Sequence, residues 1–302
     1  MFAGIIATSL ALGPSVLYAA LGEVVGQRTG IVNLGIEGVM LMGAAVGFAV
    51  GVTSHSAALG VLAGIGVGCV FNLLLGVMVV TRHTNQLASG FALYFLGGGI
   101  STLIGRDYVG RRLRGLGPLT VPGLSDLPHP WDGVFRQDPL VWLMVPIAAL
   151  LWWLMFRTRW GLHLRAVGED KNSAFAAGLH PGRVQYQALA VAGGLSGLAG
   201  AHLALAYTKT WQDGMTAGRG FVAIVIVIFA LWRPLRAIPG ALLFSGAIAV
   251  GLQLQAHGSH ISPFLLDMLP YLLTIAVVLA WGRARAFAVP AGLREVFAGT
   301  SK

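Results

Sequence analysis

Long apolar runs dominate this chain and restrict it to a membrane environment. Of its 302 residues, 56% are hydrophobic and only 10% are charged, and the mean hydropathy is +0.77. A soluble domain has about 25% charged residues, so this chain lacks the polar side chains needed to cover a globule in water. Several runs approach the roughly 20 apolar residues that a helix needs to cross a bilayer. We therefore predict an all-α polytopic membrane protein.

We predict about nine transmembrane helices, within a range of eight to ten, and we expect residues 1–302 to form one membrane domain. The expected crossings are 2–22, 34–52, 57–80, 86–104, 139–156, 184–207, 220–232, 238–255 and 264–281. The seventh range is too short to span a bilayer as a straight helix, because a helix rises only about 1.5 Å per residue. Broken helices are common in transport pathways, so we expect this range to be half of one.

The distribution of basic residues predicts the orientation. If the polar segment 157–183 is cytoplasmic and the other segments alternate, seven of the chain's 20 Lys and Arg residues are external. These seven are Arg106, Arg111, Arg112, Arg114, Arg136, Lys209 and Arg219. The other thirteen form the cytoplasmic majority of the positive-inside rule, so the N-terminus is predicted outside and the tail 282–302 inside. The cluster Arg106–Arg114 opposes this, but it lies in a long external loop, about 105–138, where charge is counted less strictly.

The same distribution explains the net charge of +9. No basic patch is interleaved with aromatic residues, so we do not expect nucleic-acid binding. The external loop 105–138 is rich in Gly and Pro. We expect it either to receive a soluble partner or to form an ordered cap that has none.

Motifs for catalysis are absent from the sequence. No G-x-x-x-x-G-K-[ST] motif occurs and none of the three lysines follows a glycine, so the chain cannot hydrolyse ATP through a P-loop. The single cysteine, Cys69, excludes an intrachain disulfide and a Cys metal cluster. The eight histidines are scattered. We therefore expect no catalytic residue, no metal site and no cofactor bound by this chain, and we predict that it is not an enzyme.

Many of the 43 glycines recur at intervals of four residues. The rows are Gly60, Gly64, Gly68, Asn72 and Gly76; Gly43, Gly47 and Gly51; and Gly193, Gly197 and Ala201. Small residues at this spacing allow helix backbones to approach closely in lipid. We expect tight helix packing along these rows, with a surface that slides during transport as the alternative.

Polar side chains enter the apolar runs in the first half of the chain. Asn33 and Glu37 are one helical turn apart and can share a face. A carboxylate at this depth needs a partner or water. Glu37 therefore either caps or pairs with a cytoplasmic helix end, or it lines the translocation path or latches the inner gate. Asn72, on a glycine row, either bonds to another helix or lines a pore. Asn85 and Gln86 either cap the fourth run or line its mouth.

Polar and aromatic residues also lie at the external ends of later runs. Trp211 suits an interfacial anchor, and beside Gln212 it also suits stacking against a ring-shaped solute. Gln253 lies at the external end of the eighth run. We keep Asn33, Glu37, Asn72, Asn85, Gln86, Trp211 and Gln253 as candidate residues of a translocation path.

The segment 157–181, RTRWGLHLRAVGEDKNSAFAAGLHP, is polar, strongly basic and contains a predicted helix. Residues 170–177 can form two helical turns, because alanines favour a helix. Gly178 supplies a stop, and Pro181 prevents continuation. A short helix with small side chains between charges suits insertion into a partner's groove. The alternative is an ordinary basic loop.

The chain resembles the permease subunits of bacterial ATP-binding-cassette (ABC) importers, in the simple-sugar and nucleoside branch. The resemblance lies in GEVVGQRTGIVNLGIEGVMLMGA and in GLHLRAVGEDKNSAFAAGLHPGRVQYQALAVAGGLSGLAGA. It extends more weakly through GRGFVAIVIVIFALWRPL and covers essentially the whole chain. It implies a helical fold of the vitamin-importer type in the bacterial inner membrane, and this chain looks like the shorter of two paired permeases.

The resemblance also implies partners and a docking segment. The partners are an ABC ATPase, with two fused cassettes, that binds ATP and Mg; a second permease subunit, identical or different; and an extracellular solute-binding lipoprotein or periplasmic protein. In the family a central cytoplasmic loop inserts into the ATPase. In this chain the matching loop, 161–178, contains Arg165, Gly168, Glu169, Ala174, Ala177 and Gly178. Since Ala-Phe-Ala-Ala-Gly stands where other importers have a Glu, Arg165 and Glu169 are the candidates for the polar contact.

We therefore predict an ABC importer permease for a nucleoside or a related small polar solute. One alternative is a permease of the same family for a sugar or another solute. A second is a secondary transporter driven by an ion gradient, which needs buried acids such as Glu37 or Asp267. A third is a membrane scaffold that transports nothing.

Overall fold

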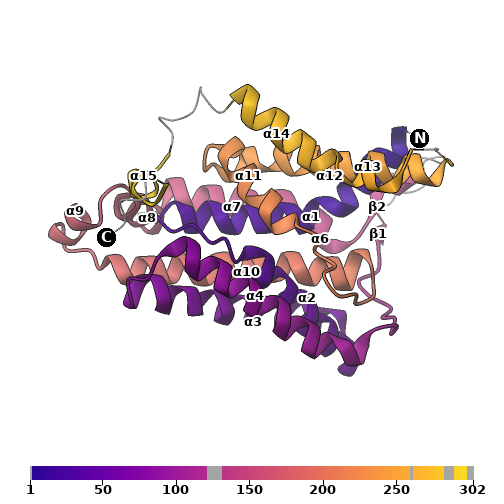
Figure 1. Ribbon diagram of the computed structural model, residues 1–302, viewed down its shortest axis with the longest axis horizontal. Helices are drawn as coiled ribbons and strands as arrows, with labels where there is room; N and C mark the ends of the chain where they lie inside the picture. Colours follow the sequence, from indigo (N-terminus) through magenta and orange to yellow (C-terminus); the bar gives the residue numbers. More distant parts are fainter. Residues whose placement is uncertain (1, 121–130, 259–260, 282–288, 298–302) are drawn as a thin grey trace.

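The computed structural model describes residues 2–120, 131–258, 261–281 and 289–297. Most of these residues are helical, and the long helices lie side by side along one axis (Figure 1). The N-terminus and the two short strands lie at one end of this bundle, whereas helix α9 (Lys171–Ala176) lies at the other. We call these the N-terminal end and the α9 end.

Seven helices in the described ranges are long and apolar enough to cross a membrane. They are α1 (Phe2–Gln27), α2 (Ile36–Thr53), α3 (Ala57–Gly76) with the π-helical turn Val77–Thr81, α4 (Gln86–Gly105) with the 3-10 turn Arg106–Tyr108, α6 (Pro139–Trp142) with α7 (Met144–Arg157), α10 (Pro181–His202) with the π-helical turn Leu203–Tyr207, and α12 (Pro234–Ala256). The prediction of an all-α polytopic membrane protein is confirmed at this level.

Two further predicted crossings coincide with shorter apolar helices. The seventh is α11 (Arg219–Ala230), with only 12 residues. The ninth is divided between α13 (Pro263–Asp267) and α14 (Leu269–Trp281). The count of nine crossings therefore stays a prediction.

Polar residues between the apolar runs start several helices. Ser56, Asn85 and Asp138 each accept a hydrogen bond from a backbone amide in the first turn of α3, α4 and α6. Thr158 does the same for α8 (Arg159–Glu169). The first amides of a helix have no intrahelical partner, so these side chains set where each helix begins.

The three glycine rows meet at one contact among α2, α3 and α10. A Cβ atom added at Gly64 would lie 2.7 Å from the Ala201 Cβ and 2.9 Å from the Gly43 carbonyl oxygen. One added at Gly197 would lie 2.1 Å from the Gly64 carbonyl oxygen. By contrast, one added at Gly66 of the same helix α3 meets nothing within 4 Å. The glycine rows thus bring helix backbones into direct contact, as expected for close packing in lipid.

The loop predicted at 105–138 lies at the N-terminal end (Figure 1). Strands β1 (Leu119–Thr120) and β2 (Arg136–Gln137) pair antiparallel, with Leu119 opposite Gln137. Helix α5 (Asp132–Phe135) directly precedes β2. Residues 121–130 of this loop lie outside the described ranges.

The C-terminal part that the structure describes returns to the α9 end. There α15 (Ala291–Phe297) lies beside α8 (Figure 1). Of the predicted tail 282–302, residues 282–288 and 298–302 lie outside the described ranges. The described part of the tail therefore lies at the end of the bundle that carries α9.

Candidate functional site

Glu37, in the first turn of α2, is buried and accepts three hydrogen bonds from the segment that leads into α11. Its Oε1 accepts from Thr216 Oγ1 and from the Gly218 amide, both at 2.6 Å. Its Oε2 accepts from the Gly220 amide at 2.6 Å. A carboxylate is favourable at a helix N-terminus, where amides are unpaired and the helix dipole is positive. Glu37 therefore caps α11 from 179 to 183 positions away in the sequence.

This cap lies in the interior of the bundle. The opposite end of α11 is held by Arg28, which follows α1 at the α9 end. Arg28 donates from Nε to the Trp232 carbonyl oxygen at 3.2 Å and from Nη2 to that of Leu231 at 3.3 Å. A helix of 12 residues spans roughly 18 Å, so Glu37 and Arg28 hold opposite ends of α11. Glu37 therefore caps the start of α11, and whether it also lines the translocation path stays a prediction.

The chain that precedes α11 is irregular over residues 208–218. Its backbone is left-handed at Gly214, Ala217 and Gly218, with φ of +63°, +46° and +77°. Tyr271 on α14 donates to the Ala217 carbonyl oxygen at 2.9 Å. The crossing therefore consists of an irregular segment followed by a half-length helix, the arrangement expected of a broken helix.

Arg219, counted among the external basic residues, is the first residue of α11 and lies near Glu37. Its Nη1 donates to the carbonyl oxygens of Met215 and Thr216 at 2.9 and 3.1 Å. The charges of Arg219 and Glu37 are close enough to interact. The Arg219 Nε atom is buried and has no hydrogen-bond partner within the described residues. A cation near a buried carboxylate lowers the free-energy cost of keeping that carboxylate in the bundle.

Asn33 and Asn72 lie together and are buried. Asn33 Nδ2 donates to Asn72 Oδ1 at 2.8 Å, and Asn72 Nδ2 donates to the Leu189 carbonyl oxygen on α10 at 2.7 Å. Asn33 Oδ1 accepts from the Gly35 amide at 2.7 Å. The two amides thus link the entry of α2 to α3 and α10, which is the interhelical bonding considered for Asn72.

Asn85 and Gln86 act on neighbouring backbone. Asn85 caps α4 by accepting from the amides of Leu87 and Ala88 at 3.0 and 3.1 Å. Gln86 Oε1 accepts from the Val32 amide at 3.0 Å, and its Nε2 donates to a carbonyl oxygen, that of Gly30, at 3.2 Å. Gln86 therefore holds the connection between α1 and α2, at the residues directly before Asn33.

Trp211 and Gln253 lie apart from these groups. Trp211 is 1% exposed and packs in a core cluster with Phe48 and Leu205. A Cβ atom added at Gly105 would lie 2.0 Å from Trp211 Nε1, so a glycine is required there. In this conformation Trp211 is a core residue, and its place in a translocation path stays a prediction. Gln253 is half-buried on α12 and lies against α1.

The predicted helix in the basic segment is present as α9. Asp170 caps it by accepting hydrogen bonds from the Asn172 amide, at 2.8 Å, and from the Ser173 hydroxyl. The Ser173 hydroxyl and the nearby amides lower the pKa of the Asp170 carboxyl. The helix ends before Gly178, whose φ is +84°. Pro181 is the first residue of α10, so it starts the next helix as well as preventing continuation of α9.

Two adjacent side chains of α9 face opposite ways. Ala174 is buried in the main core cluster, whereas Phe175 is 66% exposed. Ala177 is also exposed. Phe175 therefore leaves a large apolar side chain on the outer face of α9. The sequence contained this signal, because Phe175 is the one aromatic residue between Trp160 and Tyr186, but our sequence analysis did not single it out.

Arg165 and Glu169, the candidates for the polar contact with a partner, are held by the chain itself. Arg165 Nε donates to the Gly161 carbonyl oxygen at 3.3 Å, and its guanidinium lies 5.3 Å from the centre of the Phe156 ring. Glu169 Oε2 accepts from the Ala291 amide of α15 at 3.3 Å. These contacts hold α8 against α7 and α15, although Glu169 remains exposed.

Gly168 is needed for close packing at the same place. A Cβ atom added there would lie 2.0 Å from the Arg28 carbonyl oxygen. The α8 backbone therefore rests directly on the connection that follows α1.

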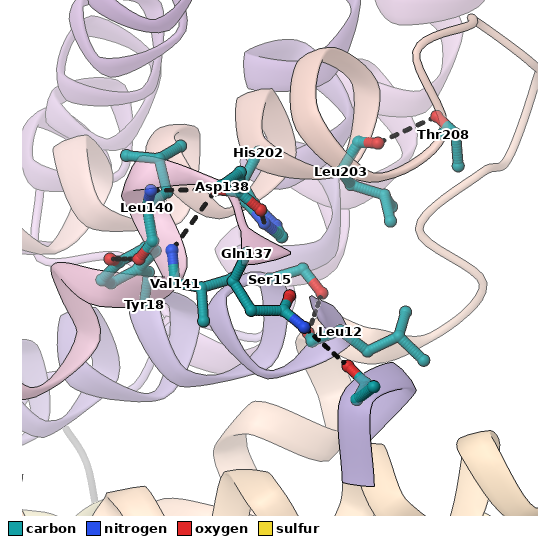
Figure 2. Close-up of polar contacts among 11 residues, drawn as sticks. Leu12, Ser15, Tyr18, Gln137, Asp138, Leu140, Val141, His202, Leu203 and Thr208 are labelled. Carbon is teal, nitrogen blue, oxygen red and sulfur yellow. Dashed lines mark hydrogen bonds and ion pairs between the residues drawn. The ribbon is translucent and has the colours of Figure 1, made fainter. Parts of the chain in front are cut away.

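A second polar cluster, at the N-terminal end, was not predicted (Figure 2). Buried His202 on α10 lies with Nε2 3.4 Å from Asp138 Oδ2, and Asp138 Oδ1 accepts from the amides of Leu140 and Val141 at 2.9 and 3.3 Å. Tyr18 on α1 donates to the Leu140 carbonyl oxygen. Burial acts to raise the pKa of Asp138, but His202 and the two amides outweigh it and hold this pKa below its usual value. The cluster joins the start of α6 to α1 and α10.

Glu37, the Asn33–Asn72 pair and Asp138 all hydrogen-bond to other parts of the chain and so join separate helices. Within the described residues, no group of three or more His, Cys, Asp or Glu is arranged to hold a metal ion.

Comparison with known proteins identifies the family. The model of the branched-chain amino acid transport system permease component matches residues 5–278. The putative glucose ABC transporter permease protein TsgC13 of Haloferax volcanii is 33% identical over 298 aligned positions, which cover 91% of each chain. The nucleoside ABC transporter permease protein NupC of Lactococcus lactis is 30% identical, over 91% of this chain and 90% of the relative.

The guanosine ABC transporter permease protein NupQ of Bacillus subtilis is 28% identical over 93% of each chain. The family match and the relatives confirm the predicted resemblance. They concern transport components and not enzymes, and they agree with the apolar helices in describing a multi-pass cell-membrane protein. The chain belongs to the branched-chain amino acid transport system permease family and is the permease subunit of an ABC importer.

Proposed function

We propose that this permease carries a nucleoside, or a related small polar solute, into the cell. The family match carries the assignment to a permease. The nucleoside assignment draws on two relatives, named for nucleosides and for guanosine, at 30% and 28% identity. A simple sugar is the second candidate, because the relative at 33% identity is named a putative glucose permease.

The energy comes from partners. A permease of this kind works with an ATPase and a solute-binding protein. We propose an ATPase of two fused cassettes, which alone binds ATP and Mg, and a second permease subunit, identical or different. The solute arrives on an extracellular lipoprotein or a periplasmic binding protein.

We further propose nine crossings, an external N-terminus and a cytoplasmic C-terminus, with α9 docking into the ATPase. The N-terminus and α9 lie at opposite ends of the bundle (Figure 1), which supports this topology. The exposed Phe175 on α9 is the apolar group that we expect to enter the ATPase groove, with Ala177 beside it and Gly178 ending the helix. Arg165, Gly168, Glu169 and Ala174 hold this segment on the bundle.

The irregular segment 208–218 is our candidate for the wall of the translocation path. Strained backbone conformations gather at functional sites, and here Glu37 and Tyr271 hold several of them in place. We propose that Glu37, Asn33, Asn72 and Gln86 position this wall through the bonds described above. Exposed Asn85 and half-buried Gln253 are the candidates that reach the solute from the two ends, and Trp211 packs behind the wall.

Uptake into proteoliposomes tests the function. The permease, its ATPase and its binding protein are reconstituted, and uptake of labelled guanosine and of labelled glucose is followed with ATP on the ATPase side. We expect uptake of guanosine that requires ATP. Uptake of glucose alone would select the second candidate.

The matched control is the same complex with an ATPase that cannot hydrolyse ATP. We expect this control to show no accumulation. Accumulation driven by a sodium or proton gradient without the ATPase would contradict the proposal and indicate a secondary transporter.

A further inference from the structure

Three arginine side chains surround one aromatic ring at the α9 end. The guanidinium carbons of Arg28, Arg165 and Arg233 lie 5.8, 5.3 and 6.0 Å from the centre of the Phe156 ring. They come from three parts of the chain: the end of α1, helix α8 and the link between α11 and α12. The fold therefore brings three positive charges together at the end of α7.

These charges lack a matching acid. Arg28 and Arg165 donate hydrogen bonds only to backbone carbonyl oxygens in the contacts above, and no salt bridge joins Arg28, Arg165 or Arg233 to an acid within the described residues. Burial and the neighbouring charges of Arg165 and Arg233 lower the pKa of Arg28, although Glu169 opposes this. An arginine remains protonated in proteins. A bound anion would relieve the repulsion among the three charges.

The surroundings indicate where such an anion comes from. Phe156 stacks with Trp152, with ring centres 6.5 Å apart, and the Arg157 guanidinium lies 5.9 Å from the Trp152 ring centre. Trp153, on the outer face of α7, is 52% exposed. Trp and Arg residues at the end of an apolar helix are typical of the level of lipid headgroups. The cluster thus borders the bilayer surface, where anionic headgroups are abundant.

We propose that Arg28, Arg165 and Arg233 bind the phosphate group of an anionic phospholipid in the leaflet at the α9 end, against Phe156. Guanidinium groups bind phosphate through paired, charge-assisted hydrogen bonds, and basic pockets between membrane helices recognise such headgroups. Arg28 also holds the carbonyl end of α11. The lipid therefore joins the C-terminal end of α11 to α8, since it binds both Arg28 and Arg165.

Native mass spectrometry of the full-length permease tests this, with phosphatidylglycerol and phosphatidylcholine as the two lipid probes. The variant is Arg233→Gln, because Arg233 is exposed. The matched control is Arg236→Gln, an exposed arginine of α12 three residues on. We expect Arg233→Gln to weaken phosphatidylglycerol binding about fivefold, as for the loss of one basic residue at an anionic surface. Arg236→Gln and phosphatidylcholine binding should show no such change.

Three further measurements separate a lipid site from a soluble-anion site and from an ATPase contact. Phe156→Leu, checked for an unchanged melting temperature, should weaken phosphatidylglycerol binding as well, because the ring supports the guanidinium groups. Equal effects of Arg233→Gln and Arg236→Gln would overturn the site. Displacement of the lipid by excess inorganic phosphate would assign the site to a soluble anion instead. Loss of ATPase co-purification in Arg233→Gln with unchanged lipid binding would assign the surface to the ATPase and also overturn the proposal.

Discussion

Helices α9 and α11 are both short, but they are held in opposite ways. The cap of α9 is Asp170, the residue directly before it, and the outer face of the helix presents Phe175. The cap of α11 is Glu37, on a different crossing 179 to 183 residues away, and Arg28 holds its other end. One helix is completed by its own segment, and the other is completed only by the folded bundle.

This difference matters for a transporter. A helix with its own cap keeps its shape when a partner pulls on it, so α9 suits transmission of movement. The start of α11 is capped by α2, so a movement of α2 is passed directly to α11. We therefore expect changes at α11 to affect the fold and changes on the outer face of α9 to affect coupling alone.

We expect Glu37→Ala to cause the largest loss in the free energy of unfolding. This change leaves the Thr216 hydroxyl and the Gly218 and Gly220 amides without their acceptor. It also leaves half-buried Arg219 without the nearby negative charge. Losing hydrogen bonds to a buried charged group costs about 1–3 kcal/mol for each group left unpaired. We expect a loss of roughly 4 kcal/mol or more, measured by denaturant unfolding of the purified permease.

Glu169→Ala is the matched control, since it removes an exposed carboxylate that accepts one hydrogen bond. We expect little change in its unfolding midpoint. Equal destabilisation by the two variants would remove the contrast between a helix held by the bundle and one held locally.

We expect a smaller loss of stability from Gly64→Leu, with Gly66→Leu as the matched control. A side chain at position 64 meets Ala201 and the Gly43 backbone at under 3 Å, whereas one at position 66 meets nothing within 4 Å. Overpacking typically destabilises by about 1–3 kcal/mol. Gly64→Leu should lower the melting temperature and Gly66→Leu should leave it nearly unchanged; the same value for both would show that the α2–α3–α10 contact is not close-packed.

The smallest effect is expected from Asp170→Ala, and it should be confined to α9. The Ser173 hydroxyl and the amides of Asn172 and Ser173 donate hydrogen bonds to the Asp170 carboxylate and lower its pKa. Its cap is therefore fully present above the ordinary carboxyl pKa of about 4 and is lost as the pH falls through the lowered pKa. Amide hydrogen exchange across 171–176 should be faster in Asp170→Ala at neutral pH, with no change in α11. Faster exchange in both helices would contradict a cap that acts locally.

Local features were predictable, and long-range pairings were not. The apolar runs predicted the long helices because lipid leaves few other structures, and Gly178 predicted the end of α9 because its left-handed backbone favours glycine. The surroundings of Glu37 and Trp211 could not be predicted, because their partners are remote in the sequence. The Asp138–His202 pair was missed for the same reason, as neither residue lies in a motif that indicates the other.

The account depends most on α9 as the point where the ATPase acts, and Phe175→Ala tests this directly. The matched control is Phe264→Ala, which removes an equally large ring, 82% exposed, on α13 at the N-terminal end. Solute-stimulated ATPase activity is measured in the reconstituted complex, with the melting temperature of each permease as the check on folding. We predict a loss of stimulation of about tenfold or more for Phe175→Ala, as for a buried interface anchor, and none for Phe264→Ala. Full stimulation in a folded Phe175→Ala complex would contradict the account.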